Sequence, residues 1–78
     1  MPEVFRELGY RFYFYSDDHL PIHIHVSYGD GEAKFNVSGD GATLVVSNGM
    51  KANELKTAKR LIEANIDEII ICWIQYFS

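Results

Sequence analysis

The chain has little cysteine, little positive charge and no long apolar run, and each of these shortages argues against a structural feature or a class of protein. Its one cysteine, Cys72, cannot form an internal disulfide, and its isoleucine-rich surroundings predict a buried, reduced thiol. Lys and Arg number 7 against 11 Asp and Glu, so the net charge of -4 argues against a generally basic nucleic-acid binder. Residues 69–74 form an apolar run too short to cross a membrane. We therefore expect a soluble, cytoplasmic protein with no membrane association and no targeting segment.

The length of 78 residues predicts one domain, residues 1–78, with a single thin core. Strand-like patterns come first in the chain and helical patterns come last. The expected fold class is α+β, an antiparallel sheet of roughly four to five strands in two to three hairpins, packed against two C-terminal helices.

Three turns containing glycine predict the hairpins. A turn at Leu8-Gly9 sets Arg6 opposite Arg11 and Phe5 opposite Phe12. Asp30-Gly31 and Asp40-Gly41 have the residue types of a type I′ turn. The apolar pairs expected from these two turns are Ile24 with Val37, Val26 with Phe35, Tyr28 with Ala33, Leu44 with Val37, and Val46 with Phe35. The sheet is thus expected to have one apolar face, which includes a last strand over residues 42–47.

Helical spacing begins after Ser47-Asn48-Gly49, and Ser47 or Asn48 is the expected N-cap. The apolar residues of this first helix would be Met50, Leu55, Ala58, Leu61 and Ile62. Asn65 and Glu68 have the spacing of a capping box that opens a second helix over residues 66–77.

The second helix is apolar on nearly every side, which exceeds the single stripe that an amphipathic helix buries. A domain of this size has little mass to cover it, so we expect Ile71, Ile74 and Tyr76 to contact a second protein chain. That chain is either another copy, in a homodimer, or a different small protein. The alternative is that the helix is wedged between the sheet and the first helix.

All three histidines, His19, His23 and His25, fall within seven positions. Apolar residues alternate with His23 and His25, so both imidazoles should share one face of a strand. Ser27, Lys34 and Asn36 share that polar face, with His25 opposite Asn36 and Ser27 opposite Lys34. In the first hairpin, Val4 shares a face with Arg6, Arg11, Tyr13 and Tyr15, and if the hairpins form one sheet these two arginines and two tyrosines join the polar face.

Three interpretations of this face remain open. In the first interpretation, His23 and His25 bind a metal, with Asp17, Asp18 or His19 completing the ligand set. Alternatively, the histidines with Arg6, Arg11, Tyr13, Lys34 and Asn36 bind a phosphate-bearing ligand such as a nucleotide or RNA, and His23 or His25 acts as a catalytic acid or base. In the third interpretation the histidines are structural and the face is solvated or covers a partner.

Residues 15–28 carry a motif, Asp18-His19-x-Pro21-x-His23-x-His25, followed by Tyr28-Gly29 and Glu32-Ala33. It resembles the domain-of-unknown-function family 4160 of small bacterial proteins, whose usual motif is Asp-His-x-Pro-Pro-His-x-His. Ile22 stands where the family commonly has a second proline. Glu68 and Trp73 fit the closing helix of the family, and Asn65 stands where a histidine or another polar residue is expected. The likeness extends over nearly the whole chain.

The resemblance carries no established activity or cofactor, but it implies a genetic context. Members of the family are often encoded beside a second small domain, family 2442, in an arrangement like a toxin and antitoxin pair. The hypothesis is therefore a toxin-like or accessory component of a two-protein module, whose histidine face binds a phosphate-bearing or metal ligand. The rival hypothesis is a non-catalytic protein-protein interaction module with structural histidines.

Overall fold

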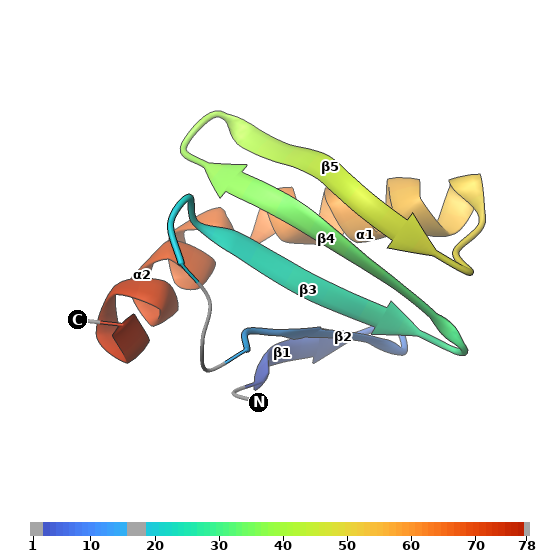
Figure 1. Cartoon of the computed structure of the whole chain (residues 1–78), viewed down its shortest axis with the longest axis horizontal. Helices are drawn as coiled ribbons and strands as arrows, with labels where there is room; N and C mark the ends of the chain where they lie inside the picture. Colours follow the sequence, from blue (N-terminus) through green and yellow to red (C-terminus); the bar gives the residue numbers. More distant parts are fainter. Residues whose placement is uncertain (1–2, 16–18, 78) are drawn as a thin grey trace.

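The computed structural model describes residues 3–15 and 19–77, and it has the predicted α+β architecture. Five strands form one antiparallel sheet in the order β1-β2-β3-β4-β5. Their bounds are Glu3–Glu7, Tyr10–Tyr13, His23–Tyr28, Gly31–Ser38 and Gly41–Asn48. Helices α1, Ala52–Ala64, and α2, Ile66–Phe77, follow the sheet. In Figure 1, α1 crosses behind β4 and β5, and α2 lies at the end of the sheet where β3 begins.

The first hairpin has the predicted pairing. Arg6 pairs with Arg11 and Phe5 with Phe12, and the Phe5 and Phe12 rings stack with centroids 4.3 Å apart. Leu8 and Gly9 both have positive φ, as the turn requires. An irregularity between Glu3 and Phe5 changes the register at the start of β1. Val4 packs against the core there, so its predicted placement on one face with Arg6 and Arg11 is wrong.

The second and third hairpins turn one residue earlier than predicted. Tyr28 pairs with Gly31 and Ser38 with Gly41, so the central turn residues are Gly29-Asp30 and Gly39-Asp40. Gly29 supplies the positive φ, 58°, at the first central position of its turn. The pairing therefore moves by two residues, as the following observed pairs show: Ile24 with Phe35, Val26 with Ala33, His23 with Asn36, His25 with Lys34, and Ser27 with Glu32. Because side chains alternate with a period of two, every residue of β3 keeps its predicted face.

The predicted pairing of β5 with β4 is also wrong because β5 contains a bulge. Leu44 pairs with Phe35, but Val46 pairs with Lys34, because a register shift between Lys34 and Phe35 leaves Val45 as an extra residue. That bulge puts Val46 on the polar face instead of the apolar one.

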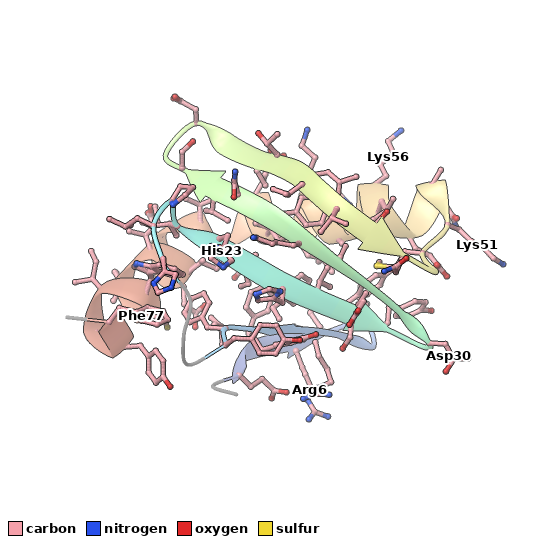
Figure 2. The ribbon with its side chains drawn as sticks, in the orientation of Figure 1. Arg6, His23, Asp30, Lys51, Lys56 and Phe77 are labelled. Atoms are coloured by element: carbon pink, nitrogen blue, oxygen red, sulfur yellow. The ribbon has the colours of Figure 1, made fainter. Side chains whose placement is uncertain are left out.

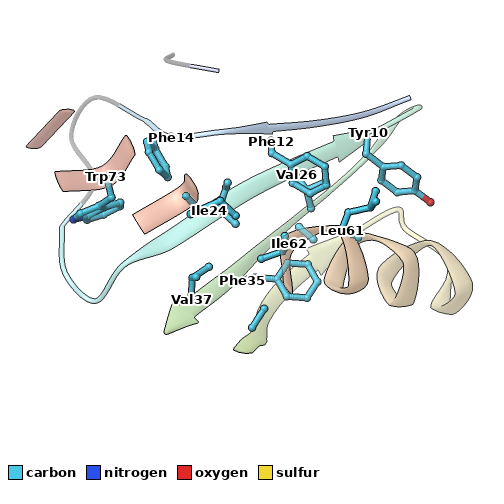
Figure 3. Close-up of a cluster of buried hydrophobic side chains, with 14 residues drawn as sticks. Tyr10, Phe12, Phe14, Ile24, Val26, Phe35, Val37, Leu61, Ile62 and Trp73 are labelled. Atoms are coloured by element: carbon cyan, nitrogen blue, oxygen red, sulfur yellow. The ribbon is translucent and has the colours of Figure 1, made fainter. Parts of the chain in front are cut away.

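The core lies between the sheet and the helices (Figure 3). Its largest fully buried side chains are Phe12, Phe14, Val26, Ile24, Phe35, Ile62 and Ile69. Trp73 of α2 packs edge-on against Phe14, which directly follows β2, with centroids 5.2 Å apart, and this contact attaches α2 to the end of that strand. Cys72 is free and only partly buried, less than predicted.

The ends of the helices differ from the predicted caps. Ser47 and Asn48 belong to β5, and α1 begins after Lys51, whose backbone N–H donates to the Glu54 carboxylate at 2.8 Å. Met50 consequently precedes the helix. α2 has the predicted bounds, but the Asn65 side chain donates to the Leu61 carbonyl at 2.8 Å and thus closes α1 instead of capping α2. No described helix has the length and hydropathy of a membrane span.

Candidate functional site

The open face of the sheet is centred on His25. Its neighbours across the strands are Tyr13 of β2 and Lys34 of β4. The imidazole stacks on Tyr13, with centroids 5.7 Å apart, and meets the Tyr15 ring edge-on at 4.3 Å. His25 is half-buried, so it both touches these rings and faces solvent. The predicted polar face therefore exists and places an imidazole, a lysine and two phenols together.

His23 has a different environment, although it lies on the same strand. It is the one buried polar residue among the described residues, with 5% of its surface exposed. Its Nδ1 lies 2.9 Å from the Pro21 carbonyl oxygen, a distance at which a protonated Nδ1 donates to that oxygen. Its ring contacts His25 on one side and Trp73 of α2 on the other, each with centroids 5.3 Å apart. His23, which is labelled in Figure 2, thus links the open face to the helix layer at the start of β3.

A groove of about 220 Å³ runs across the open face from β2 to β5. It is lined by Tyr13, Tyr15, His25, Glu32, Ala33, Lys34, Val46, Ser47 and Asn48. This volume is smaller than the roughly 300–1,000 Å³ of pockets that enclose a drug-sized ligand. The groove suits one small polar group, with the rest of a larger ligand lying on the open sheet.

Tyr13 is a buried lining residue of this groove. Burial raises the pKa of its phenol to about 12, and the hydrogen bond with Tyr15 adds to the effect. Arg11, whose guanidinium lies 5.7 Å from the centre of the Tyr13 ring, acts in the opposite direction. Tyr13 consequently stays neutral at physiological pH and takes part in the groove as a hydrogen-bonding phenol.

The two arginines of the predicted polar face form ion pairs outside the groove. Arg6 and Arg11 both contact the Glu3 carboxylate, through their Nε atoms at 3.0 and 3.2 Å. Hydrogen bonds from Arg11 and then Arg6 lower the pKa of Glu3. Neither arginine lines the groove, whereas Lys34, the cross-strand partner of His25, does.

The other predicted site residues are dispersed. Asn36 pairs with His23, two pairs along from His25 and Lys34. His19 is exposed in the segment before β3, and Asp17 and Asp18 fall outside the described residues. Across residues 3–15 and 19–77, no three His, Cys, Asp or Glu side chains come together in the manner of a metal site. The metal set of His23, His25 and Asp18 stays a prediction.

The predicted contact residues of α2 are exposed, but they do not share one side of the helix. Ile71 and Ile74 lie on its outer side. Tyr76 lies with Cys72 and Gln75 on the side that borders Glu3 and Val4. Ile71, Ile74 and Tyr76 are 54%, 57% and 46% exposed, although Trp73 and Ile69 of the same helix are buried. Within the part of the chain that the structure describes, the side of α2 that carries Ile71 and Ile74 is therefore not wedged between the sheet and α1.

Sequence reasoning missed the far wall of the groove, which consists of Glu32 and residues 46–48. The two-residue change in the β3–β4 pairing brings Glu32 opposite Ser27, and the β5 bulge turns Val46 toward Lys34. The segment Gly29-Asp30-Gly31 permits a turn at Gly29-Asp30 as well as at Asp30-Gly31. This ambiguity is the sequence signal for the change in the β3–β4 pairing.

Comparison with known proteins gives a family and nothing more specific. The family model described as a domain of unknown function (DUF4160) matches residues 9–73, which include the whole groove and most of both helices. No curated protein and no solved structure matches the chain.

Proposed function

Since this chain belongs to the DUF4160 family, whose function is unknown, we propose a function from its own groove: it binds a phosphate-bearing ligand through His25 and Lys34. The supporting observation is the cross-strand pair of an imidazole and an ammonium group in a groove lined by two tyrosines. Protonated imidazole, ammonium and phenol groups all donate hydrogen bonds to phosphate oxygens. Tyr15 adds a half-buried ring on which a nucleobase can stack.

The proposal assigns different roles to the two histidines. His25 contacts the ligand, and its imidazole can also exchange a proton with it, so it is the residue that would carry any acid or base catalysis. His23 is a positioning residue, because its buried ring contacts the His25 ring on one side and the Trp73 ring on the other. The accessory or toxin-like role in a two-protein module is the biological setting that we propose for this binding.

Calorimetric titration with a nucleoside monophosphate and with a short single-stranded RNA tests the proposal. His25→Gln and Lys34→Gln should each weaken binding by about tenfold, the loss expected for one charge-assisted hydrogen bond. Arg60→Gln is the matched control, because Arg60 is exposed on α1 and does not line the groove. Unchanged affinity in both groove variants would refute the proposal. A separate titration with zinc tests the metal prediction.

His23→Gln separates positioning from ligand contact. We expect a lower free energy of unfolding, because a buried ring and its contact with Pro21 are lost. Where the variant is folded, affinity should fall less than in His25→Gln. A larger loss of affinity with unchanged stability would assign the ligand contact to His23 instead.

The second candidate function is a non-catalytic interaction module. The exposed Ile71 and Ile74 favour it, since large apolar side chains on the outer side of a helix are typical of a contact surface, and Tyr76 adds an exposed ring on a neighbouring side of α2. The partner that the family context suggests is a small cognate protein of family 2442. Copurification of the two proteins should be lost in Ile74→Ser and retained in His25→Gln. Retention in Ile74→Ser would contradict this function for α2.

A further inference from the structure

Strand β5 is an edge strand with little protection against pairing. The sheet order leaves β1 and β5 at the two edges, and Figure 1 shows no strand beyond β5. β1 has 5 residues and carries Glu3, Arg6 and Glu7, and charges of this kind discourage a further strand. β5 has 8 residues, Gly41–Asn48, without a charged residue or a proline. Its bulge at Val45 bends the strand but does not cover the edge.

The middle of β5 also exposes apolar side chains. Leu44, Val45 and Val46 are 42%, 49% and 53% exposed, so three consecutive large aliphatic residues face solvent. Leu44 lies opposite Phe35 and Val46 opposite Lys34, which places them on different faces of the sheet. An added strand would therefore bury side chains on both faces and also hydrogen-bond with the edge backbone.

A row of lysines on α1 borders this edge. The Glu63 carboxylate accepts a hydrogen bond from the Ala42 backbone N–H at 3.0 Å, so that side of α1 faces the start of β5. Lys56 and Lys59 precede Glu63 by seven and four positions and share its side of the helix. Both are exposed, and Figure 2 shows Lys56 extending past β5. The Glu63 carboxylate thus occupies the edge at Ala42, and beyond that residue the edge combines a neutral apolar strand with the flanking positive charge of Lys56 and Lys59.

The positive charge of Lys56 and Lys59 distinguishes between two possible partners for the edge of β5, which are a second copy of this chain and a segment of a different protein. Antiparallel pairing of β5 with a second copy about a two-fold axis would place both copies of α1 on the same side of the joint sheet. Lys56 and Lys59 of one copy would then approach the same residues of the other, and like charges repel. A segment with acidic side chains is attracted instead.

We propose that β5 binds an extended segment of a partner protein as a sixth strand, with acidic side chains toward Lys56 and Lys59 and apolar side chains beside Val46. Such alternation follows from the two-residue period of a strand. The partner site shares Val46 with the groove proposed for the phosphate ligand, but it differs from that groove in using the backbone of the sheet edge and the lysines of α1 and not the imidazole of His25.

The test uses a synthetic peptide of alternating Val and Glu as long as the 8-residue strand, added to the full chain and followed by backbone amide NMR. We expect the largest shifts at residues 43–47, and slower hydrogen exchange of the outward β5 amides. Lys56→Glu should weaken binding by about threefold or more, as should high salt. Arg6→Glu is the matched control, because it makes the same charge change at the other edge of the sheet.

Three results would overturn the proposal. One is the absence of shifts in β5 with the Glu peptide. Another is equal binding of a peptide in which Lys replaces Glu, because the lysine row would then have no part in recognition. The third is a free chain that sediments as a dimer and becomes monomeric in Val45→Lys, because the occupant of β5 would then be a second copy. Circular dichroism of each variant verifies that it is folded.

Discussion

At the scale of single residues, Tyr13 provides a pH-dependent signal from the groove. Its pKa is raised from 10.0 to about 12, so folding favours the neutral phenol. This contribution to stability is fully present below pH 10 and is lost as the pH rises toward about 12. In an alkaline titration followed by tyrosinate absorbance, we expect Tyr13→Phe to remove the last step. Tyr76→Phe, a change at an exposed ring, should retain that step. Loss of the last step in Tyr76→Phe alone would contradict the assignment.

Gly31 is required by close packing. A Cβ at this position would lie 2.5 Å from the Gly49 carbonyl oxygen, which is backbone and cannot rotate away. We expect Gly31→Ala to lower the free energy of unfolding by about 1–3 kcal/mol in urea denaturation. Gly39→Ala is the control, because no atom lies within 4 Å of its Cβ position, and it should change stability by less than about 0.5 kcal/mol. Equal effects of the two changes would refute the packing explanation.

At the scale of the elements, the corner between α1 and α2 depends on Asn65. Its side chain closes α1 through the Leu61 carbonyl, while its own carbonyl accepts from the Ile69 N–H at 3.0 Å as α2 begins. Asn65→Ala should cost about 0.5–1.5 kcal/mol of unfolding free energy, the usual net value of one hydrogen bond. Asn53→Ala, at an exposed position in the first turn of α1, should be close to neutral. If Asn65→Ala leaves the free energy of unfolding unchanged, packing alone determines the angle between α1 and α2.

The hairpins show how far the sequence alone could predict these elements. Gly29-Asp30-Gly31 admits turns at Gly29-Asp30 and at Asp30-Gly31, and these turns give pairings two residues apart. Because two is also the side-chain period, both turns assign each residue to the same face. The polar face around His25 was therefore predictable although its cross-strand partner was not.

The β5 bulge could not be predicted in the same way. An extra residue at Val45 shifts the pairing by one, which exchanges the faces beyond it. No glycine or proline within residues 44–47 marks the position. The apolar Val46 was consequently assigned to the core, although it lines the groove and borders the exposed edge.

At the scale of the whole molecule, the chain has a packed side and an open side. Core residues join both helices to one face of the sheet, and the groove around His25 occupies the other. The histidine motif predicted this site, but its spacing did not distinguish a buried His23 from a half-buried His25. That difference depends on Trp73, which lies 50 positions from His23 in the chain and packs against its ring. A contact at this sequence separation is a property of the fold and has no local signal.

The central claim is that the groove around His25 binds phosphate-bearing ligands. Its most direct test is an NMR titration of the wild-type chain with a nucleoside monophosphate, which follows the backbone amides and the side chains of His19, His23 and His25. We predict saturable shifts at His25, Lys34 and Tyr13, with smaller changes at His23 and none at His19. Shifts scattered over the surface, or no saturable shift at His25, would contradict the claim.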